Sequence, residues 1–534
     1  MSKYKVILVL VIVVGAFLRL YRLGQNPPAL YWDEASLGYN AFAILKTGHD
    51  EHGEKLPVAR FIAFGDYKPP GYIYATVPFL AVFGVNEFAI RLPSAVAGIL
   101  MIGLTYILAY ALTHDERIGL AAAAVLAISP WGLQLSRVAF EAHLAALFNL
   151  VAIVIFLKSL KVRWYLPLAV FFFGLSFYTF NANRIIAPLL LGLMLVVYIK
   201  ELWQSKLWLL VSAVVGLIMI WPSVGYLETR ESRLRFQEVS IFTSLDVVKK
   251  SNDRIARSGN TWWAKLLFNR RIYFAEEFLI HYLDNFRGDF LFVVGDRNPR
   301  LATQDLGELY PYELPLLLAG IYFLLKRPSR ETALFWGWMF IAPIPAGMAR
   351  ETPHMLRIAS IIPTWQILVG IGVVQGILWL KEQKAYLKWA VGVGYSILIL
   401  GCLSYYFHNY WIHYPRDWSS EWQYGYKQLV EKVNRLEPNY DRIYITNDLG
   451  RPYIYFLLYN QIDPLVYIAE RKAERDWYGF WTVFGFGKYD FSGSQKETGR
   501  VLVVGGKDTF VHSGKKLDTV MAPDGSAIFD IGEP

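Results

Sequence analysis

Cysteine is nearly absent from this chain of 534 residues, and charged residues are scarce. The single cysteine, Cys402, lies in the apolar run SILILGCLSYYF, which excludes an intrachain disulfide and a metal site built from several cysteines. Only 18% of the residues are charged, whereas 55% are hydrophobic and 16% are aromatic, which is too apolar for a soluble protein of this size. The composition therefore places the chain in a lipid bilayer.

The formal charge of +9 is explained by membrane topology and does not indicate nucleic-acid binding, because lysine and arginine accumulate in the cytoplasmic loops of membrane proteins. No nucleic-acid partner is expected. The first apolar run, residues 6–18, follows MSKYK as in a signal peptide. The residues after it, RLYRLGQNPP, contain no small-residue cleavage site, so we expect an uncleaved first span.

A membrane-spanning helix needs about 20 mostly apolar residues. Eleven segments meet this requirement: 5–22, 92–112, 118–136, 142–157, 165–181, 184–200, 207–225, 311–326, 331–349, 358–380 and 388–408. The apolar segment 71–84 has only 14 residues and contains Pro78, so we expect a helix on the outer membrane surface. With that assignment, 14 lysines and arginines of six short loops all lie on the cytoplasmic side.

The predicted fold class is an α-helical polytopic membrane protein of about eleven spans with a C-terminal soluble α/β domain. The transmembrane domain covers residues 1–408, with a first outer loop at 23–91 that carries surface helices and a long outer loop at 226–310. Residues 409–534 alternate strand-like runs (DRIYIT, RVLVVGG, AIFDI) with the amphipathic pattern EWQYGYKQLVEKVNRL. This α/β domain is expected outside the cytoplasm.

Charged residues gather at the outer ends of the predicted helices, where they tend to be paired, solvated or functional. They are Asp33, Glu34, Asp66, Lys68, Arg137, Glu141, His143, Arg184, Arg350, Glu351, His354 and Arg357. Structural roles are open for each of them. Arg137 and Arg184 can be interface anchors, and Arg357 can begin a helix. Glu141 can be a salt-bridge partner, and Asp33 can cap the helix EASLGYNAFAIL.

Three segments together resemble a known group of enzymes. They are PALYWDEASLGYNAFAILKTG, YKPPGYIYATVPFLAVFGVNEFAIRLPSAVAGI and SPWGLQLSRVAFEAHLAAL. Their order and spacing resemble the GT-C superfamily of membrane glycosyltransferases, nearest to its protein O-mannosyltransferase-like and lipid A aminoarabinose transferase-like groups. The resemblance is good over residues 1–200, weaker through residue 410, and does not cover the C-terminal domain.

The resemblance implies a sugar donor carried on polyprenyl phosphate and an active site on the outer side of the cytoplasmic membrane. It implies that Asp33 is the catalytic base, that Glu34 completes an acidic pair, that Glu141 is a second carboxylate of the site, and that Lys68 contacts the lipid phosphate. Tyr67 stands where the aminoarabinose transferases have a glutamate that helps hold a metal. A divalent metal is therefore left open as a cofactor.

The chemistry of such a transfer explains these residue types. A carboxylate can take the proton of the acceptor hydroxyl, and positive charge stabilises the leaving phosphate. We assign the base to Asp33 and the phosphate contacts to Lys68, Arg137, Arg184 and Arg357, and a single attack would invert the anomeric carbon. The sugar, hexosyl or pentosyl, and the acceptor, a protein, a glycolipid or a polysaccharide, are not specified by the sequence.

The alternative function is a polytopic lipid or solute transporter. It would need ionisable residues at mid-membrane, and the predicted spans are nearly free of them. A membrane anchor for an outer domain would need one span only. The sequence therefore favours a multi-pass enzyme of the cytoplasmic membrane.

Overall fold

The structure is a computed structural model that describes residues 3–64, 66–476, 479–493, 499–510 and 514–534, without the side chains of residues 66, 230, 231 and 234–236. Internal contacts divide the chain into two units. The helical unit comprises Met1–Gly15, Ile99–Leu133 and Ala142–Cys402, and the mixed unit comprises Ala16–Gly98, Gln134–Glu141 and Leu403–Pro534. The C-terminal segment thus shares a unit with residues 23–91, the segment predicted as the first outer loop, and the predicted domain boundary at residues 408 and 409 stays a prediction.

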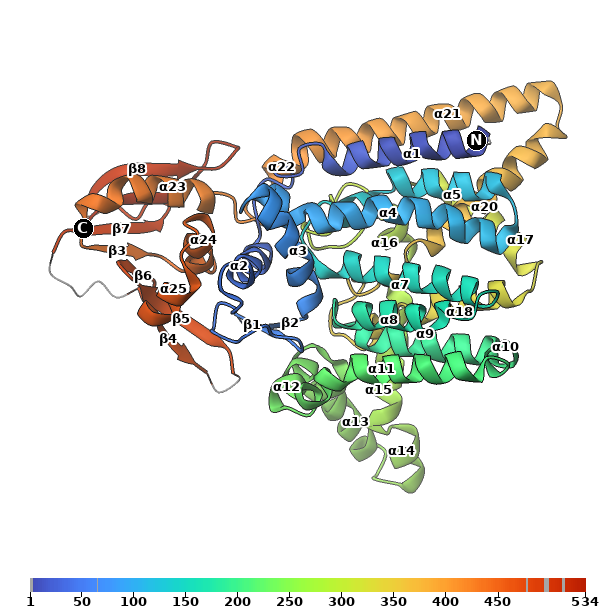
Figure 1. Cartoon of the computed structure of the whole chain (residues 1–534), viewed down its shortest axis with the longest axis horizontal. Helices are drawn as coiled ribbons and strands as arrows, with labels where there is room; N and C mark the ends of the chain where they lie inside the picture. The colour runs from blue at the N-terminus through green and yellow to red at the C-terminus, as the bar shows by residue number, and fades with distance from the viewer. Residues whose placement is uncertain (1–2, 65, 477–478, 494–498, 511–513) are drawn as a thin grey trace. The chain divides into compact units, whose positions relative to one another are not determined.

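Long apolar helices running side by side make up most of the helical unit (Figure 1). They are α1 (Lys3–Leu20), α4 (Glu87–Thr113), α5 (Glu116–Ile128), α7 (Glu141–Ser159), α8 (Tyr165–Phe177), α9 (Asn183–Val197), α11 (Lys206–Leu227), α17 (Glu313–Leu325), α18 (Arg330–Ile341), α20 (Thr364–Lys381) and α21 (Ala385–His408). Of these, α1, α4 and α21 continue into the mixed unit, and α7 begins at its last residue. Apolar side chains on nearly all faces suit these helices to a bilayer.

Shorter elements connect the long helices. They are α6 (Pro130–Ser136), α10 (Ile199–Trp203), α12 (Arg230–Val239), η1 (Ile241–Thr243), α13 (Leu245–Arg257), α14 (Trp262–Leu267), α15 (Arg270–Asp284), α16 (Gly288–Phe292), α19 (Ile344–Gly347) and η2 (Ala359–Ile361). Most of them belong to the segment 226–310, which the sequence predicts as a long outer loop.

Every predicted span coincides with a helix or with a broken pair of helices. Among the described residues, five helices are long and apolar enough to cross a membrane, and a sixth span is possible if the bent pair α5 and α6 counts as one. The interrupted spans include 118–136, which bends by 58° between α5 and α6, and 331–349, which breaks between α18 and α19. The count of eleven therefore stays a prediction.

Glycines let two helices of the helical unit approach closely. A Cβ atom on Gly372 of α20 would overlap the carbonyl of Leu316 on α17, and a Cβ on Gly320 of α17 would overlap the carbonyl of Leu368 on α20. Small residues at such crossings allow backbone-to-backbone packing in membrane helices. The pair α17 and α20 is therefore held by reciprocal glycine contacts.

Polar side chains connect further helices inside this unit. The Oγ atom of Ser360 donates to Oδ1 of Asn183 over 2.9 Å and accepts from Nδ2 of Asn149 over 3.1 Å. The indole N–H of Trp338 donates to the Ser360 carbonyl over 2.7 Å. This cluster is buried, so each bond satisfies a group that water does not reach.

The mixed unit is built on a seven-stranded sheet of order β4-β5-β6-β3-β7-β9-β8. Its strands are β3 (Arg442–Ile445), β4 (Lys472–Arg475), β5 (Trp481–Phe486), β6 (Tyr489–Asp490), β7 (Val501–Gly506), β8 (Lys515–Met521) and β9 (Ala527–Glu533). Only β3 pairs in parallel, with β6 and β7. The runs DRIYIT, RVLVVGG and AIFDI, expected as strands, form β3, β7 and β9.

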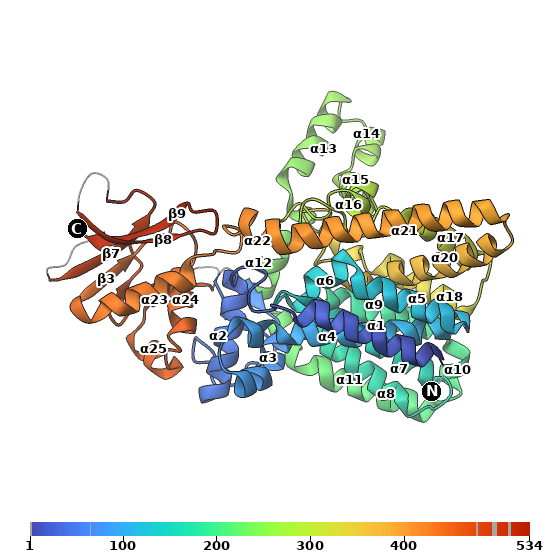
Figure 2. The same ribbon diagram turned by 90° about the horizontal axis from the view of Figure 1, so that it is seen from above.

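Helices cover one face of this sheet, as Figure 2 shows for α23 and α24. The helices and turns of the C-terminal segment are η3 (Asn409–His413), α22 (Tyr414–Asp417), α23 (Tyr426–Leu436), η4 (Glu437–Asn439), α24 (Pro452–Tyr459) and α25 (Pro464–Glu470). Tyr426 of α23 stacks on Tyr455 of α24 at 4.3 Å and contacts Phe529 of β9 at 5.1 Å. These aromatic contacts form the core between helices and sheet.

The first outer loop packs against this core. It contains α2 (Trp32–Thr47), the hairpin β1 (Phe61–Ala63) and β2 (Asp66–Lys68), and α3 (Pro70–Phe83), the helix expected on the membrane surface. The Tyr455 hydroxyl donates to the Leu30 carbonyl over 3.0 Å and to Oε1 of Gln423 over 2.7 Å, and Gln423 in turn accepts the Trp32 N–H over 2.9 Å. The C-terminal segment therefore fixes the start of α2.

We expect Gly372→Ala to lower the stability of the protein by about 1–3 kcal/mol, because the added methyl must push α17 and α20 apart. Gly376→Ala, one turn along α20, is the matched control, since a Cβ there meets its nearest atom at 3.9 Å. Thermal unfolding of the two variants in detergent measures the difference. Equal unfolding temperatures would show that these helices tolerate separation.

Candidate active site

Three charged side chains of the mixed unit meet at the ends of separate elements. The Nζ atom of Lys68, the last residue of β2, lies 3.0 Å from Oδ1 of Asp33 in the first turn of α2. The same Nζ lies 4.0 Å from Oε1 of Glu141, the first residue of α7. Lys68 and Glu141 are almost buried, whereas 28% of the Asp33 side chain is exposed. One ammonium group thus lies between two carboxylates, and Asp33 faces solvent.

The start of α2 is capped by Glu34 and not by Asp33. Tyr31 is the N-cap residue, and its backbone N–H donates to Oε2 of Glu34 over 3.1 Å. The capping interpretation of Asp33 is therefore wrong, because Asp33 lies at the second helical position. A carboxylate there is stabilised by the positive end of the helix dipole and stays available for other contacts.

Lys68 is positioned by a short hairpin and two prolines. In the hairpin, Phe61 pairs with Lys68 and Ile62 pairs with Tyr67. The buried Tyr67 ring packs on Phe480 at 4.9 Å, so the backbone of β2 is fixed next to Lys68. Pro69 and Pro70 then end the strand and begin α3, as proline favours at a helix start. The side chain of Asp66, also expected near the site, lies outside the described part.

A fully buried ion pair lies beneath the exposed carboxylate. Arg91 of α4 donates from Nε to Oε1 of Glu34 over 3.0 Å and from Nη2 to Oε2 over 2.9 Å. Both side chains are 0% exposed. Oε1 of Glu34 also accepts the Ala139 N–H over 2.7 Å, two residues before Glu141. Glu34 therefore links the helix that carries Asp33 to the segment that ends in Glu141.

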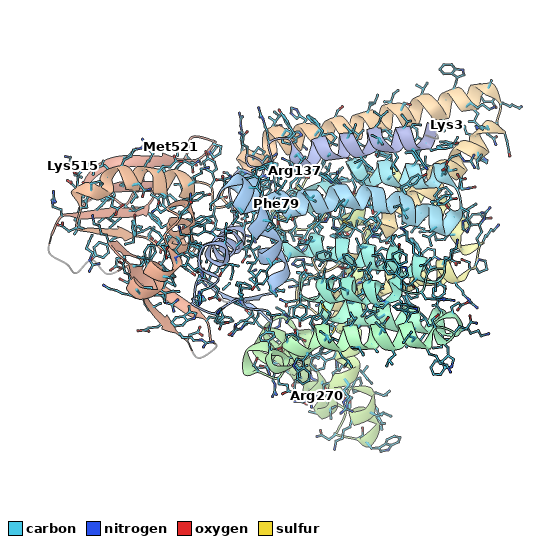
Figure 3. The ribbon with its side chains drawn as sticks, in the orientation of Figure 1. Lys3, Phe79, Arg137, Arg270, Lys515 and Met521 are labelled. Atoms are coloured by element: carbon cyan, nitrogen blue, oxygen red, sulfur yellow. The ribbon has the colours of Figure 1, made fainter. Side chains whose placement is uncertain are left out.

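Two arginines hold the backbone between α1 and α2. Besides Glu34, Arg91 donates to the carbonyls of Leu23, Pro27 and Ala29. Arg137, labelled in Figure 3, is fully buried and donates all five of its N–H groups. Its acceptors are the carbonyls of Leu18, Arg19, Arg22 and Asn26 and the hydroxyl of Tyr410. These bonds leave Arg137 no N–H group for the phosphate contact predicted from the sequence.

The remaining predicted phosphate ligands, Arg184 and Arg357, belong to the helical unit. The Arg184 guanidinium lies over the rings of Phe177 at 5.8 Å and Tyr226 at 5.3 Å. Arg357 donates to the Glu351 carbonyl over 2.7 Å. Asp33 belongs to the mixed unit, so a phosphate contact of these two arginines stays a prediction.

A divalent metal would need oxygen or nitrogen ligands around one point. Within the described residues, no group of three or more histidine, cysteine, aspartate or glutamate side chains is close enough to hold one. Between Asp33 and Glu141 the Lys68 ammonium takes the place that a cation would need. The side chains that the structure describes do not fit a metal with three protein ligands, so no catalytic step is assigned to one.

A second buried polar cluster lies in the helical unit, where sequence reasoning assigned no role to Asp296. Oδ2 of Asp296 accepts the Met355 N–H over 2.7 Å, and Oε1 of Glu308 accepts the Asp296 N–H over 3.0 Å. Burial raises the pKa of Asp296 to about 6 and that of Glu308 well above its usual value, and it lowers the pKa of His354 to about 3. The cluster ties the turn at 350–357 to the segment 296–308.

Arg91 is the residue of the candidate site that sequence reasoning missed. It lies in the run NEFAIRLPSAVAGI, which was read as part of a motif without a role for the arginine. Burying a lone arginine beside an apolar span is energetically unfavourable unless a partner neutralises its charge, so the sequence does indicate that Arg91 has a partner. Its partner could not be identified, because Glu34 is 57 residues away along the chain.

Arg91→Ala should destabilise the protein by about 3–5 kcal/mol, because the Glu34 carboxylate would stay buried without its partner. Arg117→Ala is the matched control: Arg117 also pairs with a carboxylate, that of Asp115, but its side chain is 46% exposed, so little change is expected. Thermal unfolding in detergent, followed by size-exclusion chromatography, measures both variants. Similar unfolding of Arg91→Ala and Arg117→Ala would contradict the structural role of the buried pair.

Comparison with known proteins adds to this geometry. The family model described as dolichyl-phosphate-mannose-protein mannosyltransferase matches residues 67–226, less than half of the chain. This range begins beside Lys68 and includes Arg91, Arg137 and Glu141. No curated protein sequence gives a significant match.

The fold is similar to that of solved membrane proteins. The crystal structure of ArnT from Cupriavidus metallidurans in the apo state aligns with a TM-score of 0.55 at 14% identity, covering 99% of this chain and 98% of ArnT. ArnT bound to undecaprenyl phosphate gives 0.54 at 15% identity with the same coverage. The oligosaccharyltransferase AglB from Archaeoglobus fulgidus, in complex with an inhibitory peptide and a dolichol-phosphate, gives 0.50 at 14% identity, covering 86% of this chain.

The chain spans 63% of the length of AglB but nearly all of ArnT. At these identities the likeness establishes the fold alone. The chain therefore has the fold of ArnT and AglB, and this fold, together with the family-model match to residues 67–226, agrees with the GT-C resemblance found in its sequence.

Proposed function

We propose that the protein is a membrane glycosyltransferase that moves a sugar from a polyprenyl-phosphate donor to an acceptor hydroxyl. The observation that carries the proposal is the cluster of Asp33, Lys68 and Glu141, in which an exposed carboxylate lies beside an ammonium group. The fold supports it, because the structures of similar fold include a crystal structure of ArnT bound to undecaprenyl phosphate and a structure of AglB in complex with a dolichol-phosphate. The match of residues 67–226 to a mannosyltransferase model supports the same class.

The reaction forms one bond and breaks one bond. The acceptor oxygen attacks the anomeric carbon of the sugar, and the bond from that carbon to the phosphate oxygen breaks with its electron pair leaving on the polyprenyl phosphate. Asp33 takes the proton of the acceptor hydroxyl and releases it to solvent afterwards, which its partial exposure allows. A single attack from the face opposite the phosphate inverts the anomeric configuration.

Lys68 supplies the positive charge for the leaving phosphate. Its flexible stem lets the ammonium turn from Asp33 towards the phosphate when the donor binds. Because Lys68 is almost buried, its charge acts on the phosphate with little screening by water. The departure of Lys68 from Asp33 also leaves that carboxylate free to accept a proton. Glu141 stays within reach of Lys68 and orients it or the acceptor.

Glu34 and Arg137 act through other residues in this proposal. The Glu34 carboxylate accepts hydrogen bonds from Arg91 and from the backbone N–H groups of Tyr31 and Ala139. The N–H groups of Arg137 all donate to backbone carbonyls or to the Tyr410 hydroxyl. We therefore propose both as positioning residues, whereas the sequence predicted Glu34 as the second member of the acidic pair and Arg137 as a phosphate ligand. Arg184 and Arg357 stay proposed donor contacts of the helical unit.

The reaction is proposed to take place on the outer side of the cytoplasmic membrane, where the predicted topology places residues 23–91 and 409–534. The C-terminal segment supports the start of α2 through Gln423 and Tyr455. We propose that it keeps Asp33 in place in addition to any contact with the acceptor. The donor sugar and the acceptor class are left to the assay.

Asp33→Asn should lower sugar transfer by about 10²–10⁴-fold, because the amide cannot take the proton. The measurement uses purified protein in detergent with a panel of labelled undecaprenyl-phosphate sugars. Asp253→Asn, an exposed aspartate of α13, is the matched control and should retain full transfer. Transfer that survives in Asp33→Asn would remove Asp33 as the base, and donor binding without transfer by the native chain would favour the transporter alternative.

Lys68→Ala should lower transfer by about 10²-fold or more, because the leaving phosphate loses its positive partner. Lys68→Arg should recover part of the activity, since the charge is kept while the geometry changes. Binding of undecaprenyl phosphate alone, measured beside the transfer rate, separates loss of donor affinity from loss of catalysis. Unchanged donor binding and unchanged transfer in Lys68→Ala would contradict the phosphate role.

A further inference from the structure

A helical hairpin projects from the helical unit at α13 and α14, and α15 leads the chain back (Figures 1 and 2). Its base is fixed, because Tyr282 of α15 donates to the Phe340 carbonyl over 2.7 Å and His281 contacts the Ala349 carbonyl at 2.7 Å. Within the hairpin, the Ser251 hydroxyl donates to the Phe268 carbonyl over 2.6 Å. We call residues 245–271 the projecting hairpin.

Large apolar side chains of the projecting hairpin face outwards. In the single turn and a half of α14, the exposed fractions are 79% for Trp262, 63% for Leu266 and 56% for Leu267, whereas Ala264 is fully buried. Leu245 at the start of α13 is 80% exposed. Exposure of such a patch to water is unfavourable by about 25 cal/mol for each Å² of apolar surface. A patch of this kind marks an interaction surface.

Basic side chains surround these apolar groups. Residues 249–271 contain seven basic residues and one acidic residue, Asp253: the basic ones are Lys249, Lys250, Arg254, Arg257, Lys265, Arg270 and Arg271. Those of α13 line an open hollow together with Asp246 and Asp253. The Nζ atom of Lys250 lies 3.7 Å from Oε2 of Glu276 and 4.6 Å from the centre of the Tyr273 ring. Figure 3 labels Arg270, at the start of α15.

The combination fits the surface of an anionic membrane better than water. Tryptophan is enriched at the level of lipid headgroups, where its ring is buried and its N–H stays hydrated. Lysine and arginine beside it attract anionic headgroups while their stems cover apolar surface. Leucine side chains between them can enter the upper acyl region. The hairpin offers all three kinds of contact on neighbouring residues.

We propose that the projecting hairpin is an interfacial anchor that binds the anionic phospholipid headgroups of the leaflet around the protein. Trp262 and Leu266 enter the headgroup layer, and the basic residues of α13 bind the phosphates. This lipid contact is separate from the polyprenyl donor and does not depend on the proposed sugar transfer. It would hold the segment 245–284 at the membrane surface.

The test measures the depth of one fluorescent label in the full chain. Cys402→Ala removes the native thiol, and Leu266→Cys carries an environment-sensitive dye. The protein is placed in nanodiscs of phosphatidylcholine alone or with phosphatidylglycerol, with a lipid quencher just below the headgroup. We expect quenching that is at least about twofold stronger with phosphatidylglycerol. A variant with Lys249, Lys250, Arg254 and Arg257 changed to glutamine should lose that increase.

A label at Asn434→Cys, on the polar face of α23, controls for collisions with free lipid quencher and should stay unquenched in both nanodiscs. Monodisperse elution of every variant shows that it is folded before it is measured. An unquenched label at Leu266→Cys in both lipids would overturn the proposal and leave the patch for a protein partner. Equal quenching in both lipids, unaffected by the glutamine changes, would overturn the role of anionic headgroups.

Discussion

The candidate site depends on one buried ion pair, that between Glu34 and Arg91. A charge this far from water is stable only when its partner and its other hydrogen-bonding groups are in place. Glu34 meets this condition with Arg91, the Tyr31 N–H and the Ala139 N–H, and Arg91 meets it with Glu34 and three carbonyls. Because these bonds reach several parts of the chain, the pair fixes the start of α2, which carries Asp33, and the segment that leads to Glu141 at the start of α7.

The stretch between α1 and α2 explains why two arginines are buried there. The chain forms no helix or strand between the end of α1 at Leu20 and the start of α2 at Trp32, and several carbonyls of residues 18–29 accept side-chain N–H groups. Arg137 donates to four of these carbonyls and Arg91 to three, and the other N–H groups of the two arginines bind Tyr410 and Glu34. A lysine has three N–H groups and no planar fork, so it could not replace either arginine. The hydrogen bonds from Arg91 and Arg137 thus hold the irregular backbone between α1 and α2 in one conformation.

The sequence predicted the helices well and the roles of buried charges poorly. Apolar runs of helical length mark the spans because the hydrophobic pattern is local, and the alternating runs of β3, β7 and β9 are local as well. The breaks within 118–136 and 331–349 were missed because both halves stay apolar. The adjacent residues Asp33 and Glu34 look equivalent in sequence, yet one is exposed and the other is buried on a partner 57 positions away. Pairing over such distances is decided by the tertiary fold.

The contrast between Asp33 and Glu34 carries the functional argument. A general base must accept a proton and release it, so its carboxylate cannot be committed to permanent hydrogen bonds. Glu34 is so committed, and the contact that Asp33 makes is to the flexible side chain of Lys68, which can move. In the proposed reaction the Glu34–Arg91 pair stays fixed, and Lys68 is able to leave Asp33 for the phosphate of the donor. Transfer from an anionic donor requires reacting charges that can change partners and that are held by a rigid surrounding structure.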